Sequence, residues 1–194
     1  MEKKRYERPL LKRIVPTMPG KTGQNTNAVA QTEIDGVPLE GLRERFGSPL
    51  FVFSESRLRK NIREAKQAFS TRYPEVRFAW SYKTNYLNSI CSLFHEEGSW
   101  AEVVSGFEYD KAIENGVASN RIIFNGPSKS EADLLKAMRG DSLIHIDNTE
   151  ELRLLTNLAV AEGIRPRVAI RVNLDAGIYP AWSRFGFNLE SGQA

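Results

Sequence analysis

Hydrophobic and polar residues follow two different periods along this chain. Between residues 76 and 173, five short apolar runs rich in β-branched and aromatic residues predict strands. Four of them are followed by a segment in which apolar residues recur every three or four positions, which predicts an amphipathic helix. This alternation indicates an α/β fold. The predicted strands are 76–82, 100–106, 121–126, 142–147 and 167–173, and the predicted helices are 88–98, 108–116, 131–140 and 150–163.

Two more elements are predicted ahead of this region. Residues 49–54 (PLFVFS) follow a Gly-Ser-Pro break and read as a short strand. Residues 55–73 have the helical period, with Ser54 or Ser56 as the predicted N-cap. Pro74 disfavours helical geometry in the residue before it, so we expect the helix to end there.

The strand composition decides between two parallel architectures. Nearly continuous apolar runs indicate strands that are buried on both faces and joined by right-handed crossovers. A doubly wound sheet would carry a glycine-rich phosphate turn after its first strand, but that strand ends in SYKTN. A (β/α)8 barrel gathers its chemistry at the carboxyl ends of the strands, and we therefore predict a barrel. Polar residues do lie at those positions: Lys83, Ser105, Asn125, Asp147, Asn148, Arg171 and Asn173.

Lys83 is the first candidate for chemistry, because it ends an apolar, aromatic strand. We expect its stem to lie against the aromatic residues of the same strand. Partial burial would favour the neutral amine, which can form a Schiff base with an aldehyde cofactor or a carbonyl substrate. The alternative is a solvated lysine on a surface loop, and Lys83 alone does not decide between the two.

The motifs around Lys83 resemble those of the fold-type III pyridoxal-phosphate (PLP) decarboxylases, the ornithine, diaminopimelate and arginine decarboxylase family. The diaminopimelate decarboxylase-like branch is the most similar. WSYKTN resembles the family's Y-x-x-K-x-N motif, and EVVSGFEY resembles D-V-V-S-G-G-E-L. The order of these and later segments is kept from about residue 31 to 187. The later similar segments are 121–134, 144–152, 168–173 and 183–187.

The resemblance implies a fold and a set of site residues. The fold would be a PLP-binding (β/α)8 TIM barrel of the alanine racemase-like type. Lys83 would hold the cofactor as a Schiff base, Glu102 would lie near this lysine and the cofactor's phenolic side, and Arg171 would order the carboxylates beneath the ring. Each has a structural alternative: Glu102 as a charged residue at a strand start, and Arg171 as an ion-pair residue of the barrel interior. Glu108 could equally be a carboxylate that stabilises a helix start.

Three departures from the family pattern indicate a divergent branch. Glu102 stands where the family usually has Asp and reaches one methylene further. Phe107 replaces the second glycine of the S-G-G-E segment. Arg184 replaces the usual lysine before Phe-Gly and does not reproduce the geometry of an ammonium group.

The resemblance implies decarboxylation of a basic or diamino acid through Lys83, with conversion of meso-diaminopimelate to lysine favoured. Ornithine, arginine and carboxynorspermidine remain alternative substrates. A non-catalytic PLP-binding or regulatory relative, and a structural module in which Lys83 is incidental, remain alternative functions. We expect a small-molecule amino acid as the ligand and a homodimer for a full-length protein.

The position of the last predicted strand bears on the domain organisation. Members of the family continue through three more βα units and a C-terminal β-domain. We therefore expect residues 31–194 to be the N-terminal portion of the barrel, ending after about five βα units, with the β-domain absent. The phosphate loop and the carboxylate facing the pyridine nitrogen would lie in the missing part. These 194 residues alone are expected to be inactive.

Charge and composition limit the other functions. The net charge is +3, but the first 13 residues hold six Lys or Arg and two Glu, so residues 14–194 carry −1. We interpret residues 1–30 as a basic disordered tail and linker, and we expect no nucleic-acid partner. A single cysteine, the absence of a secretory signal and the absence of a long apolar run predict a cytoplasmic protein without membrane contact. His95 and His145 lie too far apart, without neighbouring cysteines, to predict a metal site.

Overall fold

The computed structural model describes residues 31–73, 75–175 and 184–194. The chain divides into two compact units, Met1–Val52 and Phe53–Ala194. The predicted boundary at residue 30 stays a prediction, because residues 1–30 lie outside the described part. Within the described residues, no helix is long and apolar enough to cross a membrane.

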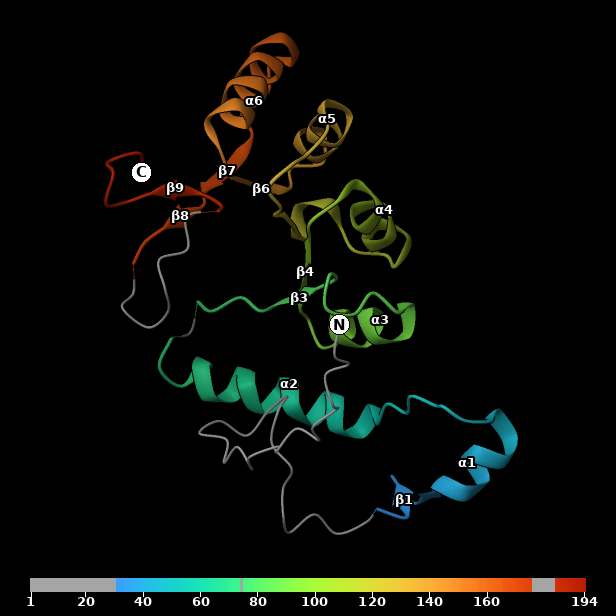
Figure 1. Cartoon of the computed structure of the whole chain (residues 1–194). Coiled ribbons are helices and arrows are strands. Elements are labelled where there is room, and N and C mark those ends of the chain that lie inside the picture. The colour runs from blue at the N-terminus through green and yellow to red at the C-terminus, as the bar shows by residue number, and fades with distance from the viewer. Residues whose placement is uncertain (1–30, 74, 176–183) are drawn as a thin grey trace, which may run out of the picture. The chain divides into compact units, whose positions relative to one another are not determined.

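The smaller unit contains a hairpin followed by a helix (Figure 1). Strands β1 (Glu33–Ile34) and β2 (Val37–Pro38) pair antiparallel and lead directly into α1 (Leu39–Phe46). The two residues between the strands, Asp35 and Gly36, both have positive φ angles. This is the backbone geometry that two-residue hairpin loops require, and an Asp-Gly pair adopts it readily.

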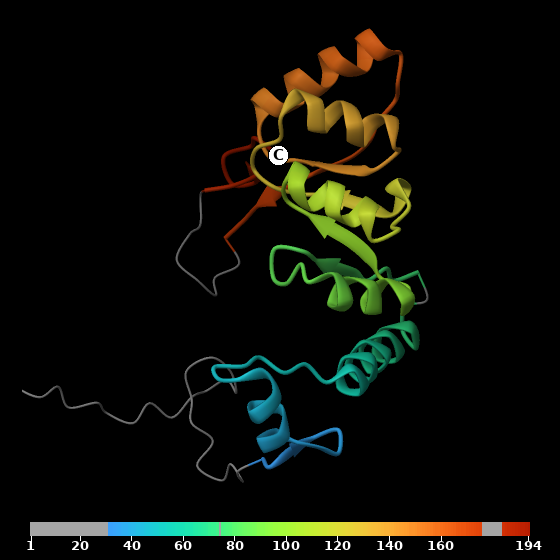
Figure 2. The same cartoon turned by 90° about the vertical axis from the view of Figure 1, so that its right-hand side faces the viewer.

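The larger unit is built on a five-stranded sheet in the order β3-β4-β5-β6-β7, with every neighbouring pair parallel. The helices between these strands lie along one side of the sheet (Figures 1 and 2). Sequential strand order with helices on one side is the arrangement of a barrel segment, since a doubly wound sheet reverses its order. The strands are β3 (Ala79–Ser81), β4 (Trp100–Val103), β5 (Ile122–Phe124), β6 (Leu143–Ile146) and β7 (Arg167–Ile170), and the helices are α3 (Asn88–Glu96), α4 (Gly106–Glu114), α5 (Glu131–Arg139) and α6 (Thr149–Glu162), with a 3-10 turn η1 (Ser119–Arg121) before β5.

The main core lies between the sheet and these helices. Alternate residues of each strand point to the same face, so every second side chain of β4, β5 and β6 enters this core. Burial of each large apolar side chain stabilises the fold by roughly 1.5–3 kcal/mol. The sheet contributes Ala101, Val103, Ile122, Phe124, Ile144 and Ile146, and the helices contribute Tyr109, Leu134, Met138 and Leu155 among others.

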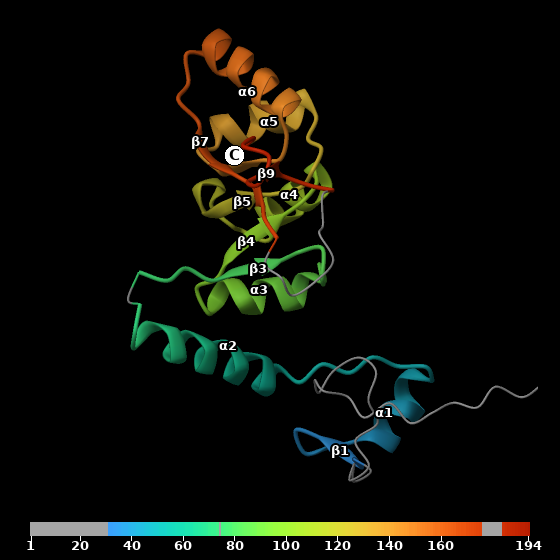
Figure 3. The same cartoon turned by 60° about the vertical axis from the view of Figure 1, so that its left-hand side comes forward.

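Helix α2 (Glu55–Ser70) precedes the first strand of the sheet and packs beside α3 (Figure 3). Its N-cap is Ser54, whose hydroxyl accepts a hydrogen bond from the backbone N–H of Arg57 at 3.1 Å. The apolar side of α2 contributes Ile62 to a second core cluster with residues of α3. In the same cluster the rings of Trp80 and Phe94 stack with centroids 3.8 Å apart.

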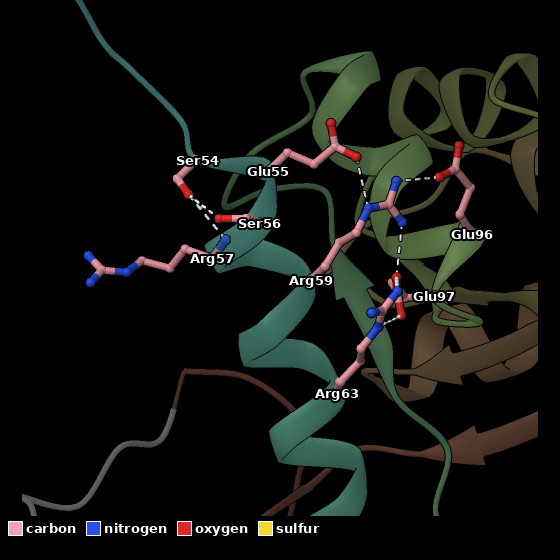
Figure 4. Close-up of polar contacts among 8 residues, drawn as sticks. All are labelled: Ser54, Glu55, Ser56, Arg57, Arg59, Arg63, Glu96 and Glu97. Carbon is pink, nitrogen blue, oxygen red and sulfur yellow. Dashed lines mark hydrogen bonds and ion pairs between the residues drawn. The ribbon is translucent and has the colours of Figure 1, made fainter. Parts of the chain in front are cut away.

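An ion-pair network fastens α2 to the end of α3 (Figure 4). The guanidinium of Arg59 contacts the carboxylates of Glu55, Glu96 and Glu97 at 2.8, 2.6 and 2.9 Å. Arg63, one turn further along α2, reaches Glu97 at 2.6 Å. Together with the apolar cluster, these contacts hold α2 against the first βα unit of the sheet.

One predicted strand is wrong, and another is interrupted. Residues 49–54 do not form a strand, because no other segment of the described chain pairs with them, and Phe51 is 89% exposed. The predicted strand 167–173 is interrupted at Arg171: β7 ends before it, and β8 (Val172–Asn173) pairs instead with β9 (Phe187–Asn188). The backbone of Arg171 turns between two neighbours, since its N–H donates to Ile146 and its carbonyl accepts from Phe187.

Candidate active site

The backbone around Lys83 is held on both sides. Tyr82 donates its N–H to the carbonyl of Glu102 at 2.9 Å, which extends the pairing of β3 with β4 by one residue. Thr84 donates both its N–H and its hydroxyl to the carbonyl of Ser81, at 3.2 and 2.7 Å. Lys83 therefore stands at a defined point, directly after the carboxyl end of β3.

The side chain of Lys83 is exposed and makes no hydrogen bond or ion pair within the described residues. The partial burial expected from the sequence is wrong. Trp80 and Tyr82 pack into the core on the helix side of the sheet, where Tyr82 is fully buried, whereas the exposed Lys83 lies in the turn from Ser81 to Thr84. The aromatic residues therefore cannot cover the lysine stem, although they anchor the strand that presents it.

Glu102 lies on β4 on the same side of the sheet as Ser81, its paired residue on β3. The hydroxyl of Ser81 donates to one carboxylate oxygen, Oε2. The side-chain amide of Asn125, just after β5, donates to the other oxygen, Oε1, at 2.9 Å. The carboxylate is thus held from both neighbouring strands. The alternative interpretation of Glu102, a charge at a strand start, does not describe this internal position.

Arg171 lies between β7 and β8 and forms an ion pair with Asp147 at 2.8 Å. Its guanidinium also lies 4.8 Å from the centroid of the Phe185 ring. Asp147 is buried, whereas Arg171 is partly exposed. No direct contact joins Arg171 to Glu102 or Lys83 in the described part of the chain. The ion pair agrees with the structural alternative for Arg171.

His145 lies on β6, and β6 lies between β4, which carries Glu102, and the Arg171 that follows β7. Burial lowers the pKa of His145, the positive charges of Lys129 and Arg171 lower it further, and the negative charge of Glu102 acts in the opposite direction. His145 therefore lies within electrostatic reach of Glu102 and of Arg171.

Glu108 caps the N-terminus of α4. Its carboxylate accepts a hydrogen bond from the N–H of Val104 at 2.8 Å, while its own N–H donates to the hydroxyl of Ser105. This arrangement resembles a capping box, except that the carboxylate takes the N–H of the residue before the N-cap, Ser105. Burial raises the pKa of Glu108, the Val104 N–H opposes this, Glu102 raises it further and Lys83 lowers it. Glu108 thus stabilises the helix start within electrostatic reach of both candidate residues.

A buried ion pair beside the site was missed in the sequence. The ammonium of Lys129 contacts the carboxylate of Glu151 at 2.7 Å, and their side chains are 0% and 5% exposed. Lys129 also donates to the carbonyls of Gly126 and His145 at 2.9 and 2.8 Å. The loop after β5 is thereby tied to the end of β6. A lysine in a polar loop carries no local signal that it will be buried.

Phe107, which replaces a glycine of the family pattern, is the second residue of α4 and lies next to the loop after Lys83. Phe107 is 63% exposed, and its ring meets the ring of Tyr86 edge-on at a centroid distance of 5.9 Å.

Among the described residues, no group of three or more His, Cys, Asp and Glu could hold a metal ion.

The comparisons with known proteins agree with this geometry. Residues 58–192 match the family described as pyridoxal-dependent decarboxylase, pyridoxal binding domain. The chain is 33% identical to the diaminopimelate decarboxylase of Aquifex aeolicus over 143 residues, which cover 73% of this chain and 33% of that protein. It is 31% identical to the Bacillus subtilis diaminopimelate decarboxylase over 183 residues, covering 90% of this chain and 41% of the relative.

Solved structures show the same fold. Diaminopimelate decarboxylase from M. jannaschii, crystallised with L-lysine, superposes with a TM-score of 0.76 at 30% identity, over 83% of this chain and 40% of that one. The enzyme from Helicobacter pylori complexed with L-lysine gives a TM-score of 0.64 at 27% identity, over 69% of this chain and 34% of that one.

The five-stranded parallel sheet thus matches part of a PLP-binding barrel, and the predicted barrel class is confirmed. The chain spans about a third to two fifths of the length of these relatives. Because the matched range, residues 58–192, covers most of the larger unit, the chain belongs to the family of pyridoxal-dependent decarboxylases, through its pyridoxal-binding domain.

Proposed function

We propose that the chain acts in the PLP-dependent decarboxylation of a basic or diamino acid, with meso-diaminopimelate as the preferred substrate and lysine as the product. The observation that carries the proposal is the placement of Lys83. An exposed amine without a bonded partner in the described residues stands at the carboxyl end of a parallel strand, inside the segment that matches the family. Active sites of barrels lie at this end of the strands.

The side chains of this region fit the cofactor chemically. Lys83 offers the primary amine that an aldehyde group requires. When bound, PLP supplies an electron sink for the electron pair left behind as carbon dioxide departs. We assign Glu102 to the environment of the lysine and of the cofactor's phenolic side. Its carboxylate is already oriented by two hydrogen bonds, which supports a fixed role.

We assign Arg171 to the ordering of carboxylates beneath the cofactor ring. Its ion pair with the buried Asp147 agrees with the structural alternative, but it also suits this role, because the pair already orders one carboxylate and fixes the guanidinium. Residues 31–194 would then form the N-terminal portion of the cofactor-binding barrel, and a full-length protein would form a homodimer.

The relatives support diaminopimelate as the substrate. The curated proteins reported above are diaminopimelate decarboxylases, and the solved structures of the enzymes from M. jannaschii and Helicobacter pylori hold L-lysine. Because the replacements at Glu102, Phe107 and Arg184 indicate a divergent branch, ornithine and arginine are tested as alternative substrates.

The test compares three amino acids as competitors for the cofactor. The chain is incubated with PLP and then with meso-diaminopimelate, L-ornithine or L-arginine, and the cofactor still attached to Lys83 is trapped with borohydride and measured. We expect meso-diaminopimelate to protect Lys83 from labelling by cofactor and borohydride at a lower concentration than the other two amino acids. Equal protection by all three, or stronger protection by ornithine or arginine, would contradict the proposed substrate.

Release of carbon dioxide separates catalysis from binding. Carboxyl-labelled meso-diaminopimelate is supplied to the wild-type chain and to Lys83→Ala with the same cofactor concentration. Release that depends on Lys83 supports decarboxylation. The replacements in the family pattern at Glu102, Phe107 and Arg184 favour a second candidate, a cofactor-binding role without turnover. Attachment to Lys83 without any release would support that candidate.

A further inference from the structure

We propose that Ser81 and Asn125 are positioning residues that hold the carboxylate of Glu102 beside the lysine anchor. The inference rests on the proposed function, in which Lys83 holds PLP and Glu102 lies near it. It assigns a task to two side chains that themselves need not touch the cofactor.

The geometry supplies one donor for each carboxylate oxygen. Ser81 on β3 donates to Oε2, and Asn125 after β5 donates to Oε1 at 2.9 Å. Glu102 lies on β4 between these strands, so the two donors approach from opposite sides. Rotation of the carboxylate away from this orientation would break at least one of the two hydrogen bonds. Hydrogen bonds to charged groups are among the stronger ones in proteins.

The Asn125 donor is itself held in place. Its backbone N–H donates to the carbonyl of Val103 at 2.8 Å. The next residue, Gly126, has a φ of +104°, and a Cβ there would lie 2.6 Å from the carbonyl oxygen of Val104. The ammonium of the buried Lys129 donates a hydrogen bond to the carbonyl of Gly126. A turn with this positive φ angle requires glycine, and the hydrogen bond from the buried Lys129 ammonium holds the glycine carbonyl in place.

The side chain of Glu102 is long enough to need the restraint that the two hydrogen-bond donors supply. The side chain of Glu102 has one methylene and one rotatable bond more than that of an aspartate. A longer side chain loses more rotamer freedom when it is fixed. Two donors on two different strands compensate by restricting the carboxylate to one place. Ser81 also ends β3, and its carbonyl accepts the N–H of Thr84, so Ser81 begins the turn that carries Lys83. The charges of Lys83 and Glu102 both act on the carboxylate of Glu108.

A double-mutant cycle tests the proposal. Wild type, Ser81→Ala, Asn125→Ala, Glu102→Ala and the two double variants with Glu102→Ala are incubated with PLP, and labelling of Lys83 after borohydride reduction is followed over time. Loss of a hydrogen bond to a charged group typically costs about 10–100-fold, so we expect each single variant to label about tenfold more slowly or slower still. Neither double variant should be slower than Glu102→Ala alone.

Two further variants separate positioning from folding. Ser81→Thr keeps the hydroxyl and should retain most of the wild-type rate. Ser130→Ala also removes a hydroxyl that donates to a carboxylate, that of Asp133 at 2.7 Å, but at the start of α5. It should label Lys83 at the wild-type rate. Effects of Ser81→Ala or Asn125→Ala that add to that of Glu102→Ala would overturn the inference, because the residues would then act independently of the carboxylate.

An arm without cofactor distinguishes failure of the inference from failure of the proposed function. The side-chain amide signal of Asn125 in a ¹H–¹⁵N spectrum should move clearly in Glu102→Ala and little in Ser130→Ala. An unmoved signal would overturn the inference whatever the cofactor does. If the signal moves but wild type never labels at Lys83, the proposed function fails, and the positioning role fails with it.

Discussion

At the scale of single residues, the site depends on which side of a strand each residue faces. Lys83 and Tyr82 are neighbours in sequence, yet one side chain is exposed and the other is fully buried. The hydroxyl of Tyr82 lies 2.9 Å from Nε2 of His95 and accepts a hydrogen bond from the side-chain amide of Asn115 at 3.2 Å. This buried network anchors the end of the strand that presents Lys83.

Tyr82→Phe should therefore destabilise the fold. Removing the hydroxyl leaves the polar groups of His95 and Asn115 without this partner, which costs about 1–3 kcal/mol of unfolding free energy. Urea unfolding measures the difference. Tyr86→Phe is the matched control, because the Tyr86 side chain is half exposed, and it should change stability by less than about 0.5 kcal/mol. Equal losses in both variants would contradict a structural role for the buried hydroxyl.

Sequence reasoning located the candidate residues but not all of their surroundings. Lys83, Glu102 and Arg171 could be selected from motifs, since motifs keep their order along the chain. Their roles stay predictions. The period of two in a strand could have shown that Trp80 and Tyr82 face the same side, but the turn after Ser81 that exposes Lys83 has no such period. Burial of Lys129 depends on a carboxylate 22 positions away, and no local pattern announces it.

At the scale of elements, α2 is held by charge as well as by apolar packing. The hydrogen bonds from Arg63 and Arg59 lower the pKa of Glu97 from 4.5 to about 2. A carboxyl group whose pKa is depressed in the folded state stabilises the fold above its unfolded pKa, and this contribution is lost as pH falls towards the folded value. The network at the end of α3 should therefore weaken between about pH 4.5 and pH 2.

Glu97→Gln tests this pH dependence. The variant should be less stable than wild type at neutral pH, and the difference should shrink as pH falls through the window between the two pKa values. Urea midpoints at neutral pH and at about pH 3 and 2 measure it. Glu64→Gln, on α2 with an exposed partner in Lys60, should show little of this trend. A pH-independent difference for Glu97→Gln would exclude ionisation of Glu97 as its cause.

The buried pair of Lys129 and Glu151 gives a second prediction at this scale. Lys129→Met leaves a carboxylate buried without its counter-charge, which typically costs 3–5 kcal/mol. Lys136→Met removes the exposed partner of Asp110 and should cost only about 0–1 kcal/mol. Thermal unfolding of both variants provides the comparison. A small loss for Lys129→Met would mean that the loop after β5 does not depend on this pair.

Elements were predictable where the local period agreed with the tertiary contacts. Helix 131–140 and strand 142–147 lie within one or two residues of α5 and β6, because their apolar sides face the core that the pattern implies. Residues 49–54 have strand composition but no pairing partner in the described chain. The break at Arg171 depends on β9, which returns to pair from a position 15 residues later.

At the scale of the molecule, one face of the sheet carries the core and the opposite face carries the polar row of Ser81, Glu102 and Asn125. Parallel strands in sequential order produce this separation, since each crossover helix lies on the same side. The barrel class could be predicted because βα alternation and the missing glycine-rich turn both favoured it. The division at Val52 could not, because it depends on which segments contact one another rather than on local composition.

Attachment of PLP to Lys83 is the measurement to make on this chain. Wild type and Lys83→Ala are incubated with PLP, reduced with borohydride, digested and mapped by mass spectrometry, with circular dichroism to show that both are folded. We predict a pyridoxyl group on Lys83 in wild type, and only a low background on other lysines in either protein. A folded wild type that carries no label at Lys83, or no more there than on its other exposed lysines, would contradict the assignment of this residue as the cofactor anchor.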